Sequence, residues 1–167
     1  MRNLLKASGI VTALAFAAFA PGAVAQEDTN KETCQAVGAS ALEPLGDREG
    51  HSISISQISC RVDSGPMSGG VLTGTSIWEW NGPNAVLGSG NGVMRKAGAT
   101  VVYVQTAGKL AVTMADGKIT GSNASGRGTF AVATGSLASL AGKSYTFSTK
   151  STGPGQFTAE NKPDTSE

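Results

Sequence analysis

The chain has 167 residues, a net charge of +1, 40% hydrophobic and 15% charged residues, 23 glycines and two cysteines. A charge this close to zero gives no electrostatic footprint for nucleic acid or for an anionic membrane, so neither is expected as a partner. Low charge and abundant glycine favour an all-β domain with many tight turns over a helical bundle.

The first 25 residues have the pattern of an export signal. Arg2 and Lys6 give a positive start, residues 10–20 are an unbroken apolar run, and Ala23 and Ala25 frame a cleavage site. This run is shorter than the roughly 20 residues that span a bilayer, so we expect a cleaved signal peptide and no membrane insertion. The mature chain would be exported, to the periplasm or beyond, and would carry 11 basic and 12 acidic residues in 142.

The rest of the chain is expected to form one domain with two short extensions. Residues 26–45 are predicted to be an N-terminal extension, residues 46–158 the folded domain, and residues 159–167 a polar tail. Cys34 and Cys60 are the only cysteines, and in an oxidising compartment such a pair predicts one disulfide. Closing this loop would tie the extension to the domain and stabilise the fold by about 3.5 kcal/mol.

Between the extensions, apolar and polar residues alternate with a period near two, which predicts about eight short antiparallel strands. In residues 51–62 the parity of the apolar positions switches after Ile55. A β-bulge near residues 56–57 is therefore expected if both halves of this strand point inward.

Both tryptophans of the chain fall in the next expected strand, at residues 71–80. Trp78 and Trp80 share one face, and Glu79 lies on the opposite one. If the indoles line the interior, Glu79 is solvated. If they face outward, Glu79 is a buried carboxyl with a raised pKa, able to act as an acid or base.

The register of the following hairpin stays open. The turn at residues 81–84 places Trp78 opposite Leu87 if its loop has four residues, and opposite Gly88 if it has five. A slip of one residue would turn every side chain of the strand to the other face.

The second half of the chain has its clearest hairpin signal at Asp116-Gly117, because a type I′ turn needs positive φ at both central positions. A long strand at residues 100–114 precedes this turn, and residues 144–148 show the cleanest alternation. About eight strands with one apolar face each can close into a barrel or stack as a sandwich. The barrel is favoured because it leaves no free sheet edge.

Glycine-rich motifs recur over residues 46–150: Gly50-His51-Ser52-Ile53-Ser54-Ile55, Asp116-Gly117, Gly126-x-Gly128-x-Phe130, Thr134-Gly135 and Leu140-x-Gly142. The pattern resembles a set of uncharacterised small exported bacterial proteins and, more loosely, allene oxide cyclase and dirigent barrels. This resemblance implies an eight-stranded antiparallel barrel, whose lumen in the plant relatives holds a hydrophobic or aromatic substrate. Ser136 departs from the pattern, which usually has a second glycine there, and no catalytic residue of those enzymes matches a position here.

Six aromatic residues are the candidate ligand-binding residues of the lumen: Trp78, Trp80, Tyr103, Phe130, Tyr145 and Phe147. With the resemblance, they predict a protein that binds a small apolar or aromatic molecule. A structural or interaction protein of the bacterial envelope with a filled barrel is the alternative, and a cyclase or isomerase is a third. No catalytic residue, metal site or cofactor is expected, because the sequence has one histidine, His51, no nucleophile elbow, no free thiols and no aspartates with calcium-loop spacing. The oligomeric state is left open.

Overall fold

The structure is a computed structural model that describes residues 28–38 and 41–164, so the expected signal peptide lies outside the described residues. The strands are β1 (Asn30–Ala36), β2 (Leu42–Pro44), β3 (His51–Ser64), β4 (Val71–Asn81), β5 (Asn84–Lys96), β6 (Ala99–Ala115), β7 (Lys118–Ala133), β8 (Ser144–Gly153) and β9 (Gln156–Pro163), with a 3-10 helix, η1 (Gly135–Leu140), before β8. The all-β prediction is confirmed.

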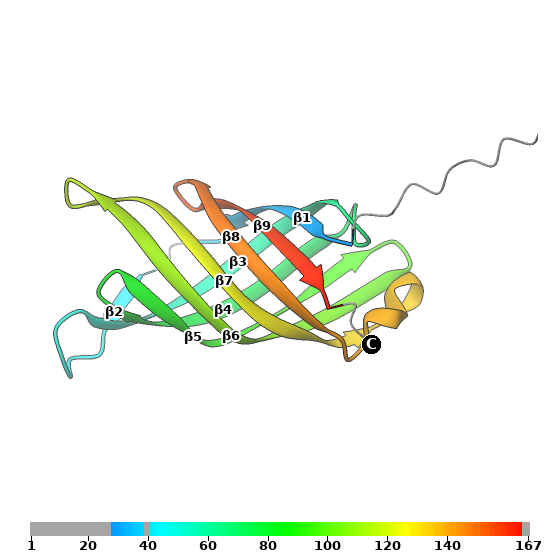
Figure 1. The fold of residues 1–167 in the computed structure, drawn as a ribbon, viewed down its shortest axis with the longest axis horizontal. Coiled ribbons are helices and arrows are strands. Elements are labelled where there is room, and N and C mark those ends of the chain that lie inside the picture. Colours follow the sequence, from blue (N-terminus) through cyan, green and yellow to red (C-terminus); the bar gives the residue numbers. More distant parts are fainter. Residues whose placement is uncertain (1–27, 39–40, 165–167) are drawn as a thin grey trace, which may run out of the picture.

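Eight of the strands close into a single antiparallel barrel (Figure 1). Strand β1 closes it, because it pairs with β9 on one side and with β3 on the other. The short β2 pairs with the first residues of β3, on the edge that β1 uses farther along. The barrel, rather than the sandwich, is therefore confirmed, with one extra strand at its rim.

The barrel begins earlier and ends later than residues 46–158. Strand β1 starts at Asn30, inside the segment expected to be an extension, and β9 ends at Pro163, inside the expected tail. In β1, Asn30, Glu32 and Cys34 are buried, and the residues between them are exposed. A strand that closes a sheet gains main-chain hydrogen bonds on both edges whatever its side chains, and this explains how so polar a segment joins the barrel.

The two ends of the barrel differ. Helix η1 lies over one end, where Leu137 and Leu140 are buried (Figure 1). At the other end lie β2 and the β6–β7 hairpin, whose turn has φ of 50° at Asp116 and 72° at Gly117, as the hairpin signal predicts. In the described part of the chain, no helix is long and apolar enough to cross a membrane.

The register places Trp78 opposite Leu87, which settles the alternative left open by the sequence. A bulge between Ile77 and Trp78 accompanies this register. The bulge expected near residues 56–57 is absent, since β3 and β4 pair without a shift. Cys60 points inward, and strand alternation then turns Ile55 outward, where 59% of its surface is exposed.

One stretch of the barrel wall lacks strand pairing. Strands β5 and β6 pair at Val86–Lys109 and again at Gly90–Gln105, but not in the three residues between. A hollow of about 660 Å³ lies against this stretch, and the buried Phe147 forms part of its lining.

Inward glycines make room for aromatic rings. A Cβ atom on Gly92 would overlap the hydroxyl of Tyr103, and one on Gly128 would lie 2.5 Å from the ring carbon Cζ of Tyr145. Gly90 and Gly92 of β5 therefore leave room for the side chains of Gln105 and Tyr103 on the neighbouring strand β6. Absence of a side chain at these positions is what lets tyrosines fill the narrow interior.

Gly128→Ala is expected to lower the free energy of unfolding by about 2 kcal/mol and the melting temperature by roughly 5–10 °C. The new Cβ would collide with the main-chain oxygen of Val104 as well as with Tyr145, so a rotamer change cannot relieve it. Gly88→Ala is the control, because its Cβ would find its nearest atom at 3.5 Å. Equal thermal denaturation curves for the two variants would contradict this account.

Candidate functional site

The six aromatic residues divide between two of the hollows formed by the described residues. Tyr103, Phe130, Tyr145 and Phe147 line a central cavity of about 60 Å³. Trp78 and Trp80 line a hollow of about 580 Å³ together with residues of β2 and of the β6–β7 hairpin. We call the first the lumen cavity and the second the mouth.

The mouth is lined mainly by apolar side chains on rigid strands. Each indole N–H has a partner: Trp78 Nε1 donates to Ser76 Oγ at 2.9 Å and Trp80 Nε1 to Ser54 Oγ at 2.8 Å. These bonds satisfy the polar edges of both rings and fix their orientation. The aliphatic residues Leu42, Leu110, Val112, Met114 and Ile119 complete the apolar lining.

Glu79 points outward because Trp78 and Trp80 point inward and neighbouring residues of a strand face opposite sides. Its side chain is 55% exposed, and its Oε1 lies 2.8 Å from His51 Nε2. The other ring nitrogen of His51 bonds Asp47, and Arg48 lies 3.1 Å from the same aspartate. Hydrogen bonds that the His51 ring donates to the carboxylates of Asp47 and Glu79 hold its pKa above the ordinary value. The single histidine thus belongs to an ion-pair cluster on the outer wall.

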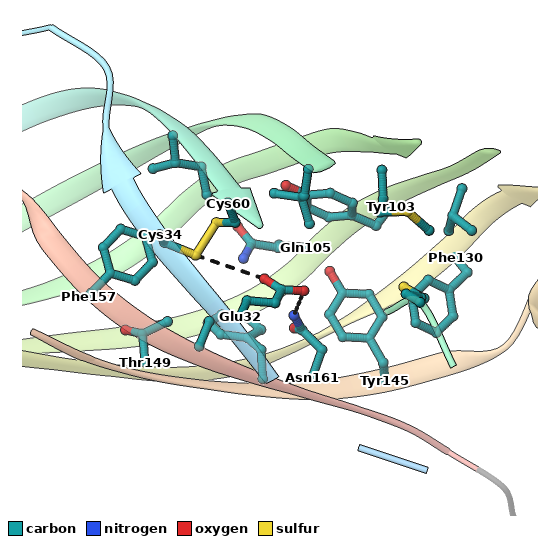
Figure 2. A pocket seen from close by; sticks show the side chains of 17 residues that line it. Glu32, Cys34, Cys60, Tyr103, Gln105, Phe130, Tyr145, Thr149, Phe157 and Asn161 are labelled. Atoms are coloured by element: carbon teal, nitrogen blue, oxygen red, sulfur yellow. Dashed lines mark hydrogen bonds between the residues drawn. A yellow bond between two sulfur atoms is a disulfide. The ribbon is translucent and has the colours of Figure 1, made fainter. Parts of the chain in front are cut away.

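The lumen cavity is walled by packed aromatic rings (Figure 2). Tyr103 and Tyr145 meet edge to face, with ring centroids 6.4 Å apart and planes at 83°. Phe130 stacks on Tyr145 at 4.7 Å. Both geometries are favourable for aromatic pairs, so these rings form a well-defined wall.

A carboxyl group that the sequence analysis did not identify points into this cavity. Glu32 on β1 is only 3% exposed, and Asn161 on β9 donates a hydrogen bond from Nδ2 to its Oε1 at 2.7 Å. The other oxygen, Oε2, lies 3.9 Å from the disulfide sulfur of Cys34, which has no proton to donate. Figure 2 shows this carboxyl between the disulfide and the ring of Tyr145.

Burial governs the ionisation of Glu32. Loss of hydration raises the pKa of this carboxyl to about 7, against the opposing hydrogen bond from Asn161, and the negative charge of Asp63 adds to the rise. Burial likewise raises the pKa of Tyr145, and the nearby Glu32 raises it further. The Tyr145 hydroxyl is buried and has no hydrogen-bond partner in the described part of the chain.

The sizes of the two hollows limit what each can hold. An apolar cavity of about 150 Å³ is large enough to bind benzene, and a water molecule takes about 30 Å³. At about 60 Å³ the lumen cavity has room for a few atoms but not for an aromatic ring. The mouth, at about 580 Å³, could accept a ring system without rearrangement of the barrel.

The predicted disulfide joins Cys34 and Cys60, which lie directly opposite each other on β1 and β3. The ligand atoms of both cysteines and of Glu32 lie within 4.8 Å of one another. Such a set could hold a soft metal only as thiolates, and the disulfide occupies both sulfurs. What this arrangement offers instead is a carboxyl held against an apolar, non-donating surface.

No family model, no curated protein and no solved structure matches this chain.

Proposed function

We propose that this protein binds a small apolar or aromatic molecule at the mouth of its barrel. The mouth supports this proposal because it combines a volume of about 580 Å³ with both indoles of the chain and five aliphatic side chains. Concave apolar sites with a few fixed polar groups are typical of small-molecule binding. A ring system that buries about 200 Å² would gain roughly 5 kcal/mol before the entropic cost of association, which suits a modest affinity.

The proposal extends to the compartment in which binding occurs. A leader with an export pattern and a disulfide between the only two cysteines favour an exported protein, in the periplasm or outside the cell. There the protein would meet small apolar molecules before they reach the cytoplasm.

Tryptophan fluorescence tests the proposal, because both emitters lie at the mouth. Titration with the neutral probe 4-phenylbutan-1-ol, with excitation at 295 nm, should change the emission and give a saturable curve. Val112→Asp should weaken this affinity at least ~10-fold, because it places a charge in the apolar lining.

The matched control is Thr113→Asp. Its charge is the same, but the residue is exposed and does not line the mouth. This variant should keep the affinity within about twofold. Equal affinities for the two variants would place the probe elsewhere, and the absence of any saturable response in the wild type would favour the structural role over binding.

A further inference from the structure

The lumen cavity has hydrogen-bonding groups that its own lining does not satisfy. Glu32 Oε2 faces a sulfur atom that cannot donate, and the Tyr145 hydroxyl, 3% exposed as a residue, has no partner in the described chain. A carboxylate oxygen accepts hydrogen bonds, and a phenol can accept one. Each of these two oxygens can therefore accept a hydrogen bond from a group that enters the cavity.

The cavity also lacks a positive charge. Seventeen residues line it, all of them described, and none is Lys, Arg or His. Buried carboxylates are normally paired with a cation or bound by several donors. Among the described side chains, Asn161 donates one hydrogen bond to Glu32, and no cation pairs with it in the lining.

Aromatic rings surround the carboxyl and suit a cation. Tyr103, Tyr145 and Phe157 all line the cavity with Glu32. The face of an aromatic ring attracts an ammonium group, more strongly where water is excluded. A carboxylate beside aromatic rings suits an amine, and about 60 Å³ matches the ammonium end of a molecule rather than its whole body.

We propose that the lumen cavity receives the ammonium group of a primary or secondary amine. Glu32 is its counter-ion, and the Tyr145 hydroxyl accepts a hydrogen bond from one of its N–H groups. This inference rests on the proposed function, since the apolar body of the same molecule would lie at the mouth. A lining ring of each hollow lies against Gly108: a Cβ atom there would lie 3.2 Å from Phe147 Cζ of the lumen cavity and 3.3 Å from Trp78 Cη2 of the mouth.

The pH dependence of binding follows from the groups around Glu32. Its carboxyl is affected by Asp63 on β3, and it acts in turn on Tyr103 of β6 and Tyr145 of β8. Burial raises the pKa of both tyrosines, so they stay neutral at physiological pH, and the disulfide does not titrate. Glu32 alone among these changes charge near pH 7, so amine affinity should fall about tenfold for each pH unit below 7.

Three probes with one apolar body separate the proposals: 4-phenylbutylamine, 4-phenylbutan-1-ol and 4-phenylbutyric acid. At pH 8 the wild type should bind the amine at least ~10-fold more tightly than the alcohol, as measured by calorimetry. Lowering the pH to 5.5 should remove most of this preference and leave the alcohol unaffected. Glu32→Gln should remove it at every pH and keep the alcohol affinity.

Glu160→Gln is the matched control, because Glu160 lies on β9 beside Asn161 but is exposed. It removes the same charge and should keep the preference for the amine. Equal binding of amine and alcohol by the wild type, or tightest binding of the acid, would overturn the amine inference and leave the proposed function standing. Failure of all three probes to bind would overturn both.

Discussion

Glu32→Gln is expected to raise the free energy of unfolding at pH 8 by about 3 kcal/mol. In the folded protein the pKa of Glu32 is raised by burial from 4.5 to about 7, so the folded state holds this proton more tightly than the unfolded state. The resulting stability is fully present below about pH 4.5 and is lost as the pH rises through about 7, which corresponds to roughly 3 kcal/mol. Glutamine keeps the acceptor for Asn161 and cannot ionise.

Urea denaturation at several pH values between 4 and 8 measures this effect. The difference between wild type and Glu32→Gln should be small at pH 4 and should grow up to about pH 7. The pKa of His51 is also raised, so its contribution to the free energy of unfolding is likewise lost as the pH rises. Only the difference between wild type and variant therefore isolates the effect of Glu32. Parallel curves for wild type and variant would mean that the carboxyl is hydrated in the folded protein.

Removal of the disulfide by the double substitution Cys34→Ala, Cys60→Ala is expected to destabilise the protein by about 3.5 kcal/mol. The bridge joins residues 26 positions apart and restricts the unfolded chain accordingly. It also ties β1, the strand that closes the barrel, to β3. A fall in melting temperature of roughly 10 °C should accompany the loss.

A reductant provides the control for this prediction. Wild-type protein in excess dithiothreitol should denature at the temperature of the double variant, and the variant should not respond to the reductant. A melting temperature shared by oxidised wild type and double variant would show that main-chain pairing alone holds β1 in place.

The fold was predictable because the barrel strands follow period-two patterns and sharp turns. Asp116-Gly117 marked a hairpin, and strand alternation predicted that Glu79 lies on the face opposite Trp78 and Trp80. The register at Trp78 was not predictable, since the sequence does not distinguish the two loop lengths that fit the turn before Asn84. The bulge near residues 56–57 was expected only if Ile55 also points inward; the parity of Cys60 instead turns Ile55 outward, so no bulge is needed.

The candidate site was half predictable. Aromatic type and strand parity identified six residues that do line the two hollows. Glu32 was missed because a charged residue in a polar segment normally lies in water. Its burial could have been predicted from Cys34, two residues later on the same strand. The disulfide turns Cys34 inward, and strand alternation then turns Glu32 inward as well.

The unpaired stretch between β5 and β6 affects how the barrel can deform. Main-chain hydrogen bonds run continuously around a closed barrel. Widening its cross-section therefore normally requires breaking the hydrogen bonds between two strands. At residues 87–89 these hydrogen bonds are already missing between β5 and β6, and Phe147 lines the hollow beside this gap. The wall can therefore yield beside Phe147, one of the rings that line the lumen cavity, and the interior could enlarge there without any loss of pairing between β5 and β6.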